Sequence, residues 1–204
     1  MGDAVEWLHH EIRRRGLARI HLAGYSMGGR IALSYALEHP EDLASLSLIG
    51  AHPGIRDAEE RAERARWDDE MAKMLEADGL HAFVNEWMKH PVLADQLRLA
   101  HSRVVAAKQG RLAHTSAGLA SAFRSLGTGR QEPMWERLAQ LTPPTLFLAG
   151  EDDAKYVGVG EAFVDAAPNA ALEVISGAGH NTLLEQPTAT IEAIRTFIER
   201  VEST

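Results

Sequence analysis

One short run, Gly24-Tyr25-Ser26-Met27-Gly28, most limits what this chain can fold into. An apolar run at residues 18–23 precedes it, and helical spacing resumes at residues 30–38. A G-x-S-x-G turn between a strand and a helix raises its serine on a sharp corner, where side chains in place of the two glycines would collide. An ordinary glycine-rich turn is the alternative, so the run has to be weighed together with the rest of the chain.

Apolar runs and amphipathic stretches alternate at both ends of the sequence. We expect strands at residues 18–23, 43–50, 145–149 and 171–175, and helices at residues 4–15, 30–38, 161–167 and 188–201. This alternation predicts an α/β fold with a mostly parallel sheet flanked by helices.

The middle of the chain is different, because it is rich in Ala, Glu, Arg, Met and Trp. It predicts several helices, broken near Gly79, Pro91, Gly110 and Gly127-Thr128-Gly129. We therefore expect residues 1–55 to form the first part of a core, residues 56–140 an inserted helical cap, and residues 141–204 the second part of the core.

Two further motifs follow predicted strands, Gly150-Glu151-Asp152-Asp153 and Gly177-Ala178-Gly179-His180. An acid and a histidine at the carboxyl ends of parallel strands would lie beside Ser26, and the chain order serine, acid, histidine is that of the α/β-hydrolase fold. The histidine can then accept the serine proton while the acid orients the imidazole. Either Asp152 or Asp153 could be this acid, and the family pattern described below favours Asp153.

We therefore expect Ser26, Asp153 and His180 to be a catalytic triad. The backbone N–H of Met27, at the start of the following helix, is in position to donate to an oxyanion.

The amino-acid composition limits which cofactors and binding partners we expect for this chain. The chain contains no cysteine, which excludes disulfides and thiolate metal sites, and its histidines show no metal-ligand spacing. A formal net charge of -8 argues against nucleic acid and anionic membranes as partners. No apolar run reaches the roughly 18 residues of a membrane span, and the first residues do not look like a signal peptide. We expect a cytoplasmic enzyme that acts on a small molecule without a metal or other cofactor.

Several longer phrases resemble one branch of the hydrolase fold. They are His21 to Ile31 (HLAGYSMGGRI), Gly50 to Gly54 (GAHPG), Ala58 to Arg66 (AEERAERAR), Trp87, Ser125 to Gly129 (SLGTG), Gly150 to Tyr156 (GEDDAKY) and Gly177 to Asn181 (GAGHN). From Arg19 onward the chain is similar to the 2-succinyl-6-hydroxy-2,4-cyclohexadiene-1-carboxylate (SHCHC) synthases of menaquinone biosynthesis.

This resemblance implies a lyase on a hydrolase scaffold. Such an enzyme removes a proton beside the succinyl carbonyl of 2-succinyl-5-enolpyruvyl-6-hydroxy-3-cyclohexene-1-carboxylate and expels pyruvate. The implied base is Ser26, polarised by His180 and oriented by Asp153.

The implied substrate carries three carboxylates, so its site should be cationic. By family position, the expected substrate contacts are Tyr25, Arg30, Arg64, Trp87, Arg111 and Lys155. Arginine can clamp a carboxylate with two parallel hydrogen bonds. The charged helix that carries Arg64 could instead face water, and Trp87, four residues after Phe83, could belong to the core of the cap. His52 is expected to be structural, within a turn.

The start of the chain departs from the family. We expect the N-terminal strands of the fold to be absent from this chain, together with the H-G loop that donates a second oxyanion N–H, because neither is found before Tyr25. The strand at residues 18–23 should then be an exposed edge. A fragment or misassigned start is preferred over assembly with another chain or a reduced variant. Two other functions remain open: a general hydrolase of esters or carbon–carbon bonds with the same triad, and a truncated inactive paralogue.

Overall fold

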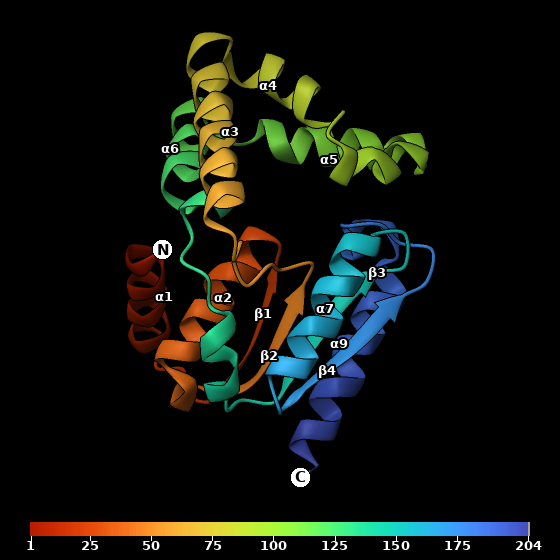
Figure 1. Cartoon of the computed structure of the whole chain (residues 1–204). Coiled ribbons are helices and arrows are strands. Elements are labelled where there is room, and N and C mark those ends of the chain that lie inside the picture. The colour runs from red at the N-terminus through yellow and green to blue at the C-terminus, as the bar shows by residue number, and fades with distance from the viewer. Residues whose placement is uncertain (204) are drawn as a thin grey trace. The chain divides into compact units, whose positions relative to one another are not determined.

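The computed structural model describes residues 1–203, and the side chains of residues 94 and 97 are left out of the description. The chain folds into two compact units (Figure 1). The first unit combines Met1–Pro53 with the chain from Pro133 onward, and the second is Gly54–Glu132. Each is described by itself.

A four-stranded parallel sheet organises the first unit. Its strands are β1 (Ile20–Tyr25), β2 (Leu43–Ile49), β3 (Thr145–Gly150) and β4 (Ala170–Ile175), and they lie side by side in that order. All three pairings are parallel, so the carboxyl ends of the strands meet at one edge of the sheet. The predicted α/β architecture is confirmed, and β1 is the outer strand beside β2.

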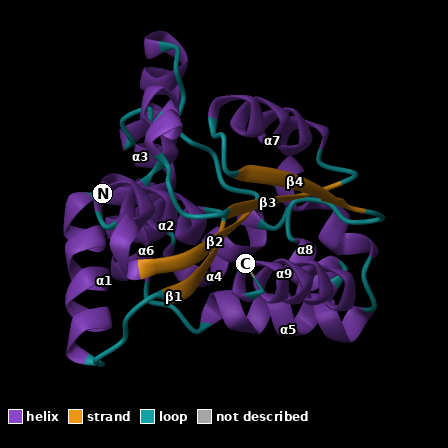
Figure 2. Ribbon diagram, turned by 90° about the horizontal axis from the view of Figure 1, so that it is seen from below, coloured by secondary structure: helices purple, strands orange, loops and turns teal. Residues whose placement is uncertain are grey.

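Helices cover both faces of this sheet (Figure 2). They are α1 (Gly2–Arg14), α2 (Met27–Glu38), α7 (Ala154–Ala166), the short α8 (Thr182–Glu185) and α9 (Pro187–Glu202). Successive side chains of β3 point to opposite faces, as the pleat of a strand requires. Phe147 packs in the core that includes α2 and α7, whereas Leu146 and Leu148 pack with Phe197 of α9. Both faces are apolar, so β3 is buried along its whole length.

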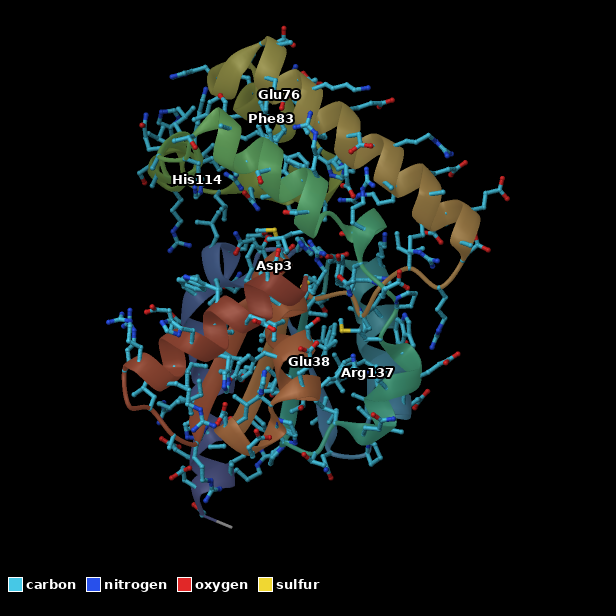
Figure 3. All side chains as sticks on the ribbon, turned by 90° about the vertical axis from the view of Figure 1, so that its left-hand side faces the viewer. Asp3, Glu38, Glu76, Phe83, His114 and Arg137 are labelled. Atoms are coloured by element: carbon cyan, nitrogen blue, oxygen red, sulfur yellow. The ribbon has the colours of Figure 1, made fainter. Side chains whose placement is uncertain are left out.

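Residues 133–140 were expected in the cap, but in the structure they lie with the first unit. They contain the 3-10 helix η4 (Trp135–Gln140), and η1 (Pro40–Asp42) is another short helix of this unit. Trp135 and Leu138 are buried in the same core as α2 and α7. Arg137, labelled in Figure 3, donates to the carbonyl oxygen of Leu37 near the end of α2, and these two atoms are 3.3 Å apart. Apolar burial against the core therefore decides where this segment lies.

The second unit is helical. It contains α3 (Ala58–Ala77), α4 (Gly79–Trp87), the 3-10 helix η2 (Pro91–Arg98), α5 (His101–Leu112), α6 (Ser116–Leu126) and the 3-10 helix η3 (Thr128–Arg130). Its core contains side chains of α3, α4 and α6, among them Leu75, Phe83 and Ala120. Phe83 is labelled in Figure 3.

The helix breaks expected in this unit are mostly where the structure has them. Gly79 begins α4 with a positive φ of 80°, and Pro91 begins η2. The break expected near Gly110 lies slightly later, because α5 continues through Gly110 to Leu112. The chain turns a few residues later instead, where the Thr115 hydroxyl accepts the Gly118 N–H at 3.1 Å and starts α6.

No helix in the described part of the chain combines the length and the apolar character that a bilayer span requires.

Candidate active site

Ser26 stands on the corner between β1 and α2. Its backbone has φ 49° and ψ -112°, although it is not a glycine. A positive φ at such a residue is uncommon and is found where a site imposes it. The Ser26 N–H donates to the carbonyl oxygen of Ile49 in β2, at 2.8 Å, and this bond ties the corner to the neighbouring strand.

Close backbone packing explains two glycines of this corner. A Cβ at Gly24 would lie 2.5 Å from the carbonyl oxygen of Gly28, and one at Gly29 would lie 2.6 Å from the Cβ of Ala51. A Cβ at Gly28 would meet no described atom within 4 Å. The expectation that Gly28 is needed for room is therefore wrong, and Gly29, the second glycine of the doublet, has that role.

A chain of hydrogen bonds runs from Ser26 through His180 to Asp153. The His180 Nε2 lies 3.3 Å from the Ser26 Oγ, and its Nδ1 lies 2.8 Å from an Asp153 carboxylate oxygen. The imidazole is only 6% exposed. A proton on Nδ1 is then held by the carboxylate, which leaves Nε2 free to accept the serine proton.

Asp153 and Asp152 have different surroundings. Asp153 begins α7, where its second carboxylate oxygen accepts the Tyr156 N–H at 3.3 Å. The Asp152 side chain is exposed, and its N–H donates to the carbonyl oxygen of Ala178 at 2.9 Å. The structure therefore places Asp153 on the imidazole and uses the backbone of Asp152 to hold the loop that carries His180.

Two tyrosine rings flank the imidazole of His180. The ring centroid of Tyr25 lies 5.5 Å from it, and that of Tyr156 lies 4.5 Å from it. Sequence reasoning included Tyr25 but missed Tyr156. A signal was present, because Tyr156 lies three residues after Asp153 on a helix and such residues share a face. The ring of His52 lies edge-on to Tyr156 with centroids 6.3 Å apart, in keeping with a structural role.

Three other expected site residues belong to this unit. Met27 is the first residue of α2, so its N–H is one of the donors that a helix leaves unsatisfied in its first turn. Arg30 lies one turn after Ser26 and is buried, with 7% of its surface exposed. Lys155 is exposed in the first turn of α7, two residues after Asp153.

Arg64 belongs to the second unit and is held within it. Its Nε donates to the Asp68 carboxylate at 2.9 Å, and its guanidinium carbon lies 4.4 Å from the centre of the Trp67 ring. The other Asp68 oxygen accepts the Gly129 N–H at 3.0 Å. A Cβ at Gly129 would lie 2.2 Å from the backbone nitrogen of Ala65, so the G-T-G phrase packs directly on α3.

Trp87 and Arg111 also contact neighbours within the second unit. The Trp87 ring lies 5.6 Å from that of Phe83, nearly parallel to it, and 5.7 Å from that of Trp67. The expected alternative, that Trp87 contributes to the core of the cap, agrees with this cluster. Arg111 donates from an Nη to the side-chain oxygen of Gln96 at 2.7 Å.

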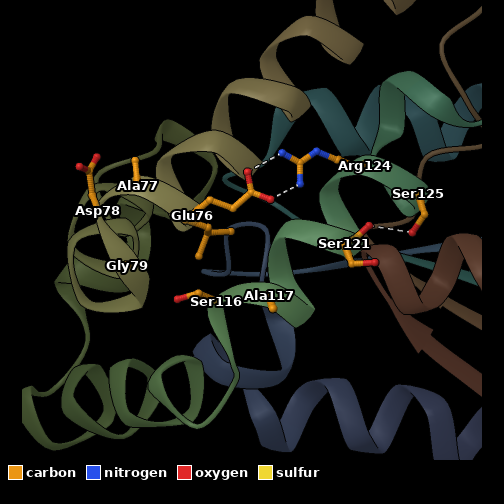
Figure 4. Close-up of a pocket in the computed structure, with 10 residues that line it drawn as sticks. Glu76, Ala77, Asp78, Gly79, Ser116, Ala117, Ser121, Arg124 and Ser125 are labelled. Carbon is orange, nitrogen blue, oxygen red and sulfur yellow. Dashed lines mark hydrogen bonds and ion pairs between the residues drawn. The ribbon is translucent and has the colours of Figure 1, made fainter.

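A hollow of about 820 Å³ lies in the second unit, between the end of α3 and α6 (Figure 4). Its lining includes Glu76 and Arg124, which are paired with each other, and the serines of α6. No member of the Ser26, His180 and Asp153 chain lines it. Its lining contains serines but no histidine, and its carboxylate Glu76 is paired with Arg124, so it is not the candidate active site.

One cluster of described residues could hold a metal ion. Ligand atoms of His9, His39 and Asp42 lie within 4.8 Å of one another. The two imidazoles are stacked with centroids 4.1 Å apart, so one ring must turn before both can face a shared ion. Asp42 already accepts from the Tyr35 hydroxyl at 2.6 Å and pairs with Arg13 at 2.8 Å. Burial and then the bond to Asp42 raise the pKa of Tyr35.

Comparisons with known proteins agree with this geometry. Residues 1–187 match the family model of the alpha/beta hydrolase fold. The chain is 32% identical to the SHCHC synthase of Pectobacterium atrosepticum over 90% of its own length and 70% of that protein. It is 34% identical to a Bacillus subtilis protein named as a candidate SHCHC synthase, over 91% of this chain and 68% of that one.

A solved structure is similar over nearly the whole chain. The structure of MenH from S. aureus superposes with a TM-score of 0.94 at 34% identity, over 97% of this chain and 74% of that one. The resemblance expected from the sequence motifs is thereby confirmed. The chain belongs to the 2-succinyl-6-hydroxy-2,4-cyclohexadiene-1-carboxylate synthase family, on the α/β-hydrolase fold.

Proposed function

We propose that this protein is a carbon–oxygen lyase that converts 2-succinyl-5-enolpyruvyl-6-hydroxy-3-cyclohexene-1-carboxylate into SHCHC and pyruvate, a step of menaquinone biosynthesis. One observation carries the proposal. A chain of this family holds Ser26, His180 and Asp153 in one hydrogen-bonded relay.

The chemical names of substrate and product define the electron flow. The substrate has its ring double bond at carbon 3 and its enolpyruvyl oxygen on carbon 5, and the product has double bonds at carbons 2 and 4. A base must therefore remove the proton from carbon 2, which is acidified by the neighbouring succinyl carbonyl. The C–H electrons form the new bond to carbon 3, the old double bond moves to carbon 4, and the C5–O bond breaks.

The relay can move the proton in this reaction. In the proposed step the Ser26 Oγ takes the proton of carbon 2 while its own proton passes to the His180 Nε2, 3.3 Å away. Asp153 stabilises the resulting imidazolium through Nδ1. The leaving enolpyruvate is protonated on carbon to give pyruvate, with imidazolium as the proton source, and the histidine is neutral again. The N–H of Met27 would donate to the enolate oxygen that develops on the succinyl carbonyl.

Substrate binding is assigned to cationic and aromatic side chains by family position. Arg30 lies one helical turn after Ser26, and as a buried arginine it can form a strong charge-assisted pair with a carboxylate. The other proposed contacts are Tyr25, Arg64, Trp87, Arg111 and Lys155. A small polycarboxylate as the partner and a cytoplasmic location belong to the same proposal.

Pyruvate release tests the proposed reaction. Purified protein is given the enolpyruvyl substrate, and pyruvate is followed through lactate dehydrogenase and NADH. The wild-type chain should release pyruvate, and Ser26→Ala should abolish the release. Hydrolysis of a neutral p-nitrophenyl ester is measured in parallel, because a general hydrolase would use the same triad through an acyl-enzyme. Clear ester turnover without pyruvate release would reject the lyase.

Arg30 separates the two functions further. Removing a charge-assisted hydrogen bond costs about 1.5–3 kcal/mol. Arg30→Ala should therefore raise KM for the enolpyruvyl substrate roughly tenfold to hundredfold and leave ester turnover nearly unchanged. Arg30→Lys is the matched control, because lysine keeps the positive charge but cannot form two parallel hydrogen bonds to a carboxylate. Its KM should lie between those of the wild type and Arg30→Ala. Equal losses on both substrates would show that the substitution damages the fold instead.

A further inference from the structure

The loop that carries His180 is held by a buried acid that has no part in the relay. Glu185 ends α8 and is 6% exposed. One of its carboxylate oxygens accepts the Gly179 N–H at 2.5 Å, and the other accepts the Asn181 N–H at 3.1 Å. The N–H groups of the residues before and after the histidine thus share one carboxylate.

This arrangement controls where the imidazole lies. With the N–H groups of Gly179 and Asn181 both bound to Glu185, the chain is held just before and just after residue 180, which restricts the position of the His180 Cα. The His180 Nε2 lies 3.3 Å from the Ser26 Oγ, near the long end of a hydrogen bond, so little displacement is tolerated. A carboxylate has two acceptor oxygens whereas an amide has one, which explains an acid rather than an amide at this position.

From this geometry we propose that Glu185 is a positioning residue for catalysis: its carboxylate clamps the two peptide N–H groups that flank His180 and so keeps the imidazole within reach of Ser26. The inference rests on the proposed function for its kinetic consequence. The clamp itself is a property of the loop and exists without substrate.

A second acid, in the loop after β3, also binds the loop that carries His180 and provides a control. Glu151, directly after β3, accepts from the Ser176 hydroxyl at 2.8 Å and from the Gly177 N–H at 3.0 Å. These two bonds, the Ser176 bond first, lower the pKa of Glu151. Glu151 is therefore, like Glu185, an acid that binds the loop of His180, but it is exposed and binds residues three and four positions before the histidine.

The test compares Glu185→Gln with Glu151→Gln. Glutamine keeps the shape of Glu185 but turns an NH₂ toward one of the two N–H groups. A displacement near 1 Å costs roughly a hundredfold in rate, so kcat for pyruvate release should fall about tenfold to hundredfold with KM changed less than about threefold. Glu151→Gln should retain kcat within about threefold. Glu185→Asp keeps the carboxylate but is one methylene shorter, so its kcat should lie between those of the wild type and Glu185→Gln. It replaces Glu185→Gln as the test variant if the glutamine variant does not fold.

A second readout is independent of the reaction. The proton on the His180 Nδ1, shared with Asp153, gives a far-downfield proton NMR resonance in a well-held pair. That resonance should shift or broaden in Glu185→Gln and remain unchanged in Glu151→Gln. If Glu185→Gln lowers the melting temperature but keeps both the wild-type kcat and the wild-type resonance, the clamp is structural only and the inference is overturned. If the wild-type protein releases no pyruvate, the proposed function fails, while the resonance still reports on the clamp.

Discussion

Replacing Gly150 by alanine should move the histidine of the relay without touching any member of it. A Cβ at Gly150 would lie 2.1 Å from the carbonyl oxygen of Gly179 and 2.2 Å from that of Ala178. Both atoms are backbone, so no side chain can turn away to make room. Gly150 itself ends β3, which is paired on both sides, by β2 and by β4. The loop before His180 must therefore yield rather than the strand.

The size of the effect follows from these distances. An ordinary contact near 3.2 Å requires the Gly179 carbonyl to retreat by about 1 Å. A shift of that size at the next residue would take the His180 Nε2 out of hydrogen-bonding range of the Ser26 Oγ, which is 3.3 Å away at the start. A 1 Å misplacement costs about a hundredfold in rate. Overpacking costs roughly 1–3 kcal/mol of stability, which lowers the melting temperature by about 2–12 °C for a chain of this size.

The assay measures kcat and KM for pyruvate release together with thermal unfolding. Gly158→Ala is the matched control, because a Cβ there would meet no described atom within 4 Å and the residue lies inside α7. It should keep the wild-type kcat and gain roughly 0.5–1 kcal/mol of stability, since alanine favours the helix interior. If Gly150→Ala kept the wild-type kcat and melting temperature, the close packing of the histidine loop on β3 would be refuted as the device that positions the imidazole.

Three other substitutions test separate parts of the molecule. Asp153→Asn should lower kcat for pyruvate release by about 10⁴-fold with little change in KM, because the amide favours the wrong imidazole tautomer; a loss under tenfold would contradict the role of Asp153. Asp68→Ala leaves the Arg64 guanidinium and the Gly129 N–H without their buried acceptor, and should cost about 3 kcal/mol in urea unfolding followed by tryptophan fluorescence. Glu11→Gln tests an ion pair on α1, where hydrogen bonds from Arg14 lower the pKa of Glu11 from 4.5 to about 2. Because the pKa of Glu11 is lower in the folded state, the pair stabilises the protein above pH 4.5 and loses this effect as the pH falls toward 2. The melting temperatures of wild type and variant should therefore differ at pH 7 and be nearly equal at pH 2.

Much of the fold could be predicted because local sequence patterns determine its strands and turns. The apolar runs that became β2 and β3 are buried along their whole length, and a strand buried on both faces has no other sequence signature. The glycine corner around Ser26 and the loops after β3 and β4 follow from the rule that parallel strands end at one edge. The sequence alone therefore predicts that the acid and the histidine lie beside the serine.

The parts that could not be predicted depend on atoms far apart in the chain. Glu185 looks like an ordinary acid at the end of a helix until its carboxylate is found on the loop of His180. Gly29 owes its role to Ala51, which lies on the next strand–loop unit. Gly110 has no close neighbour outside its own helix, so its conformational freedom is not used and the helix continues through it. Such features are decided by packing, which a local pattern does not record.

The strain at Ser26 leads to a last prediction, in which two inactive variants differ in stability. With φ 49° and ψ -112°, Ser26 holds a conformation that costs a residue with a side chain about 1–3 kcal/mol. Ser26→Gly relieves that strain, and Ser26→Ala keeps it, while both remove the hydroxyl. Glycine also loses more freedom on folding, by roughly 0.5–1 kcal/mol. The glycine variant should therefore unfold with a free energy about 1 kcal/mol higher than the alanine variant.

Ser121 provides the opposite case, because it is exposed within α6, where the backbone is helical. There the glycine variant should be less stable than the alanine variant by about 1 kcal/mol, as helix propensity dictates. Urea unfolding of all four variants gives the two differences, and their opposite signs isolate the backbone of the corner from the chemistry of the hydroxyl. If Ser26→Ala proved as stable as Ser26→Gly or more so, the corner would carry no strain. The serine would then be presented by the packing of Gly24 and Gly29 alone.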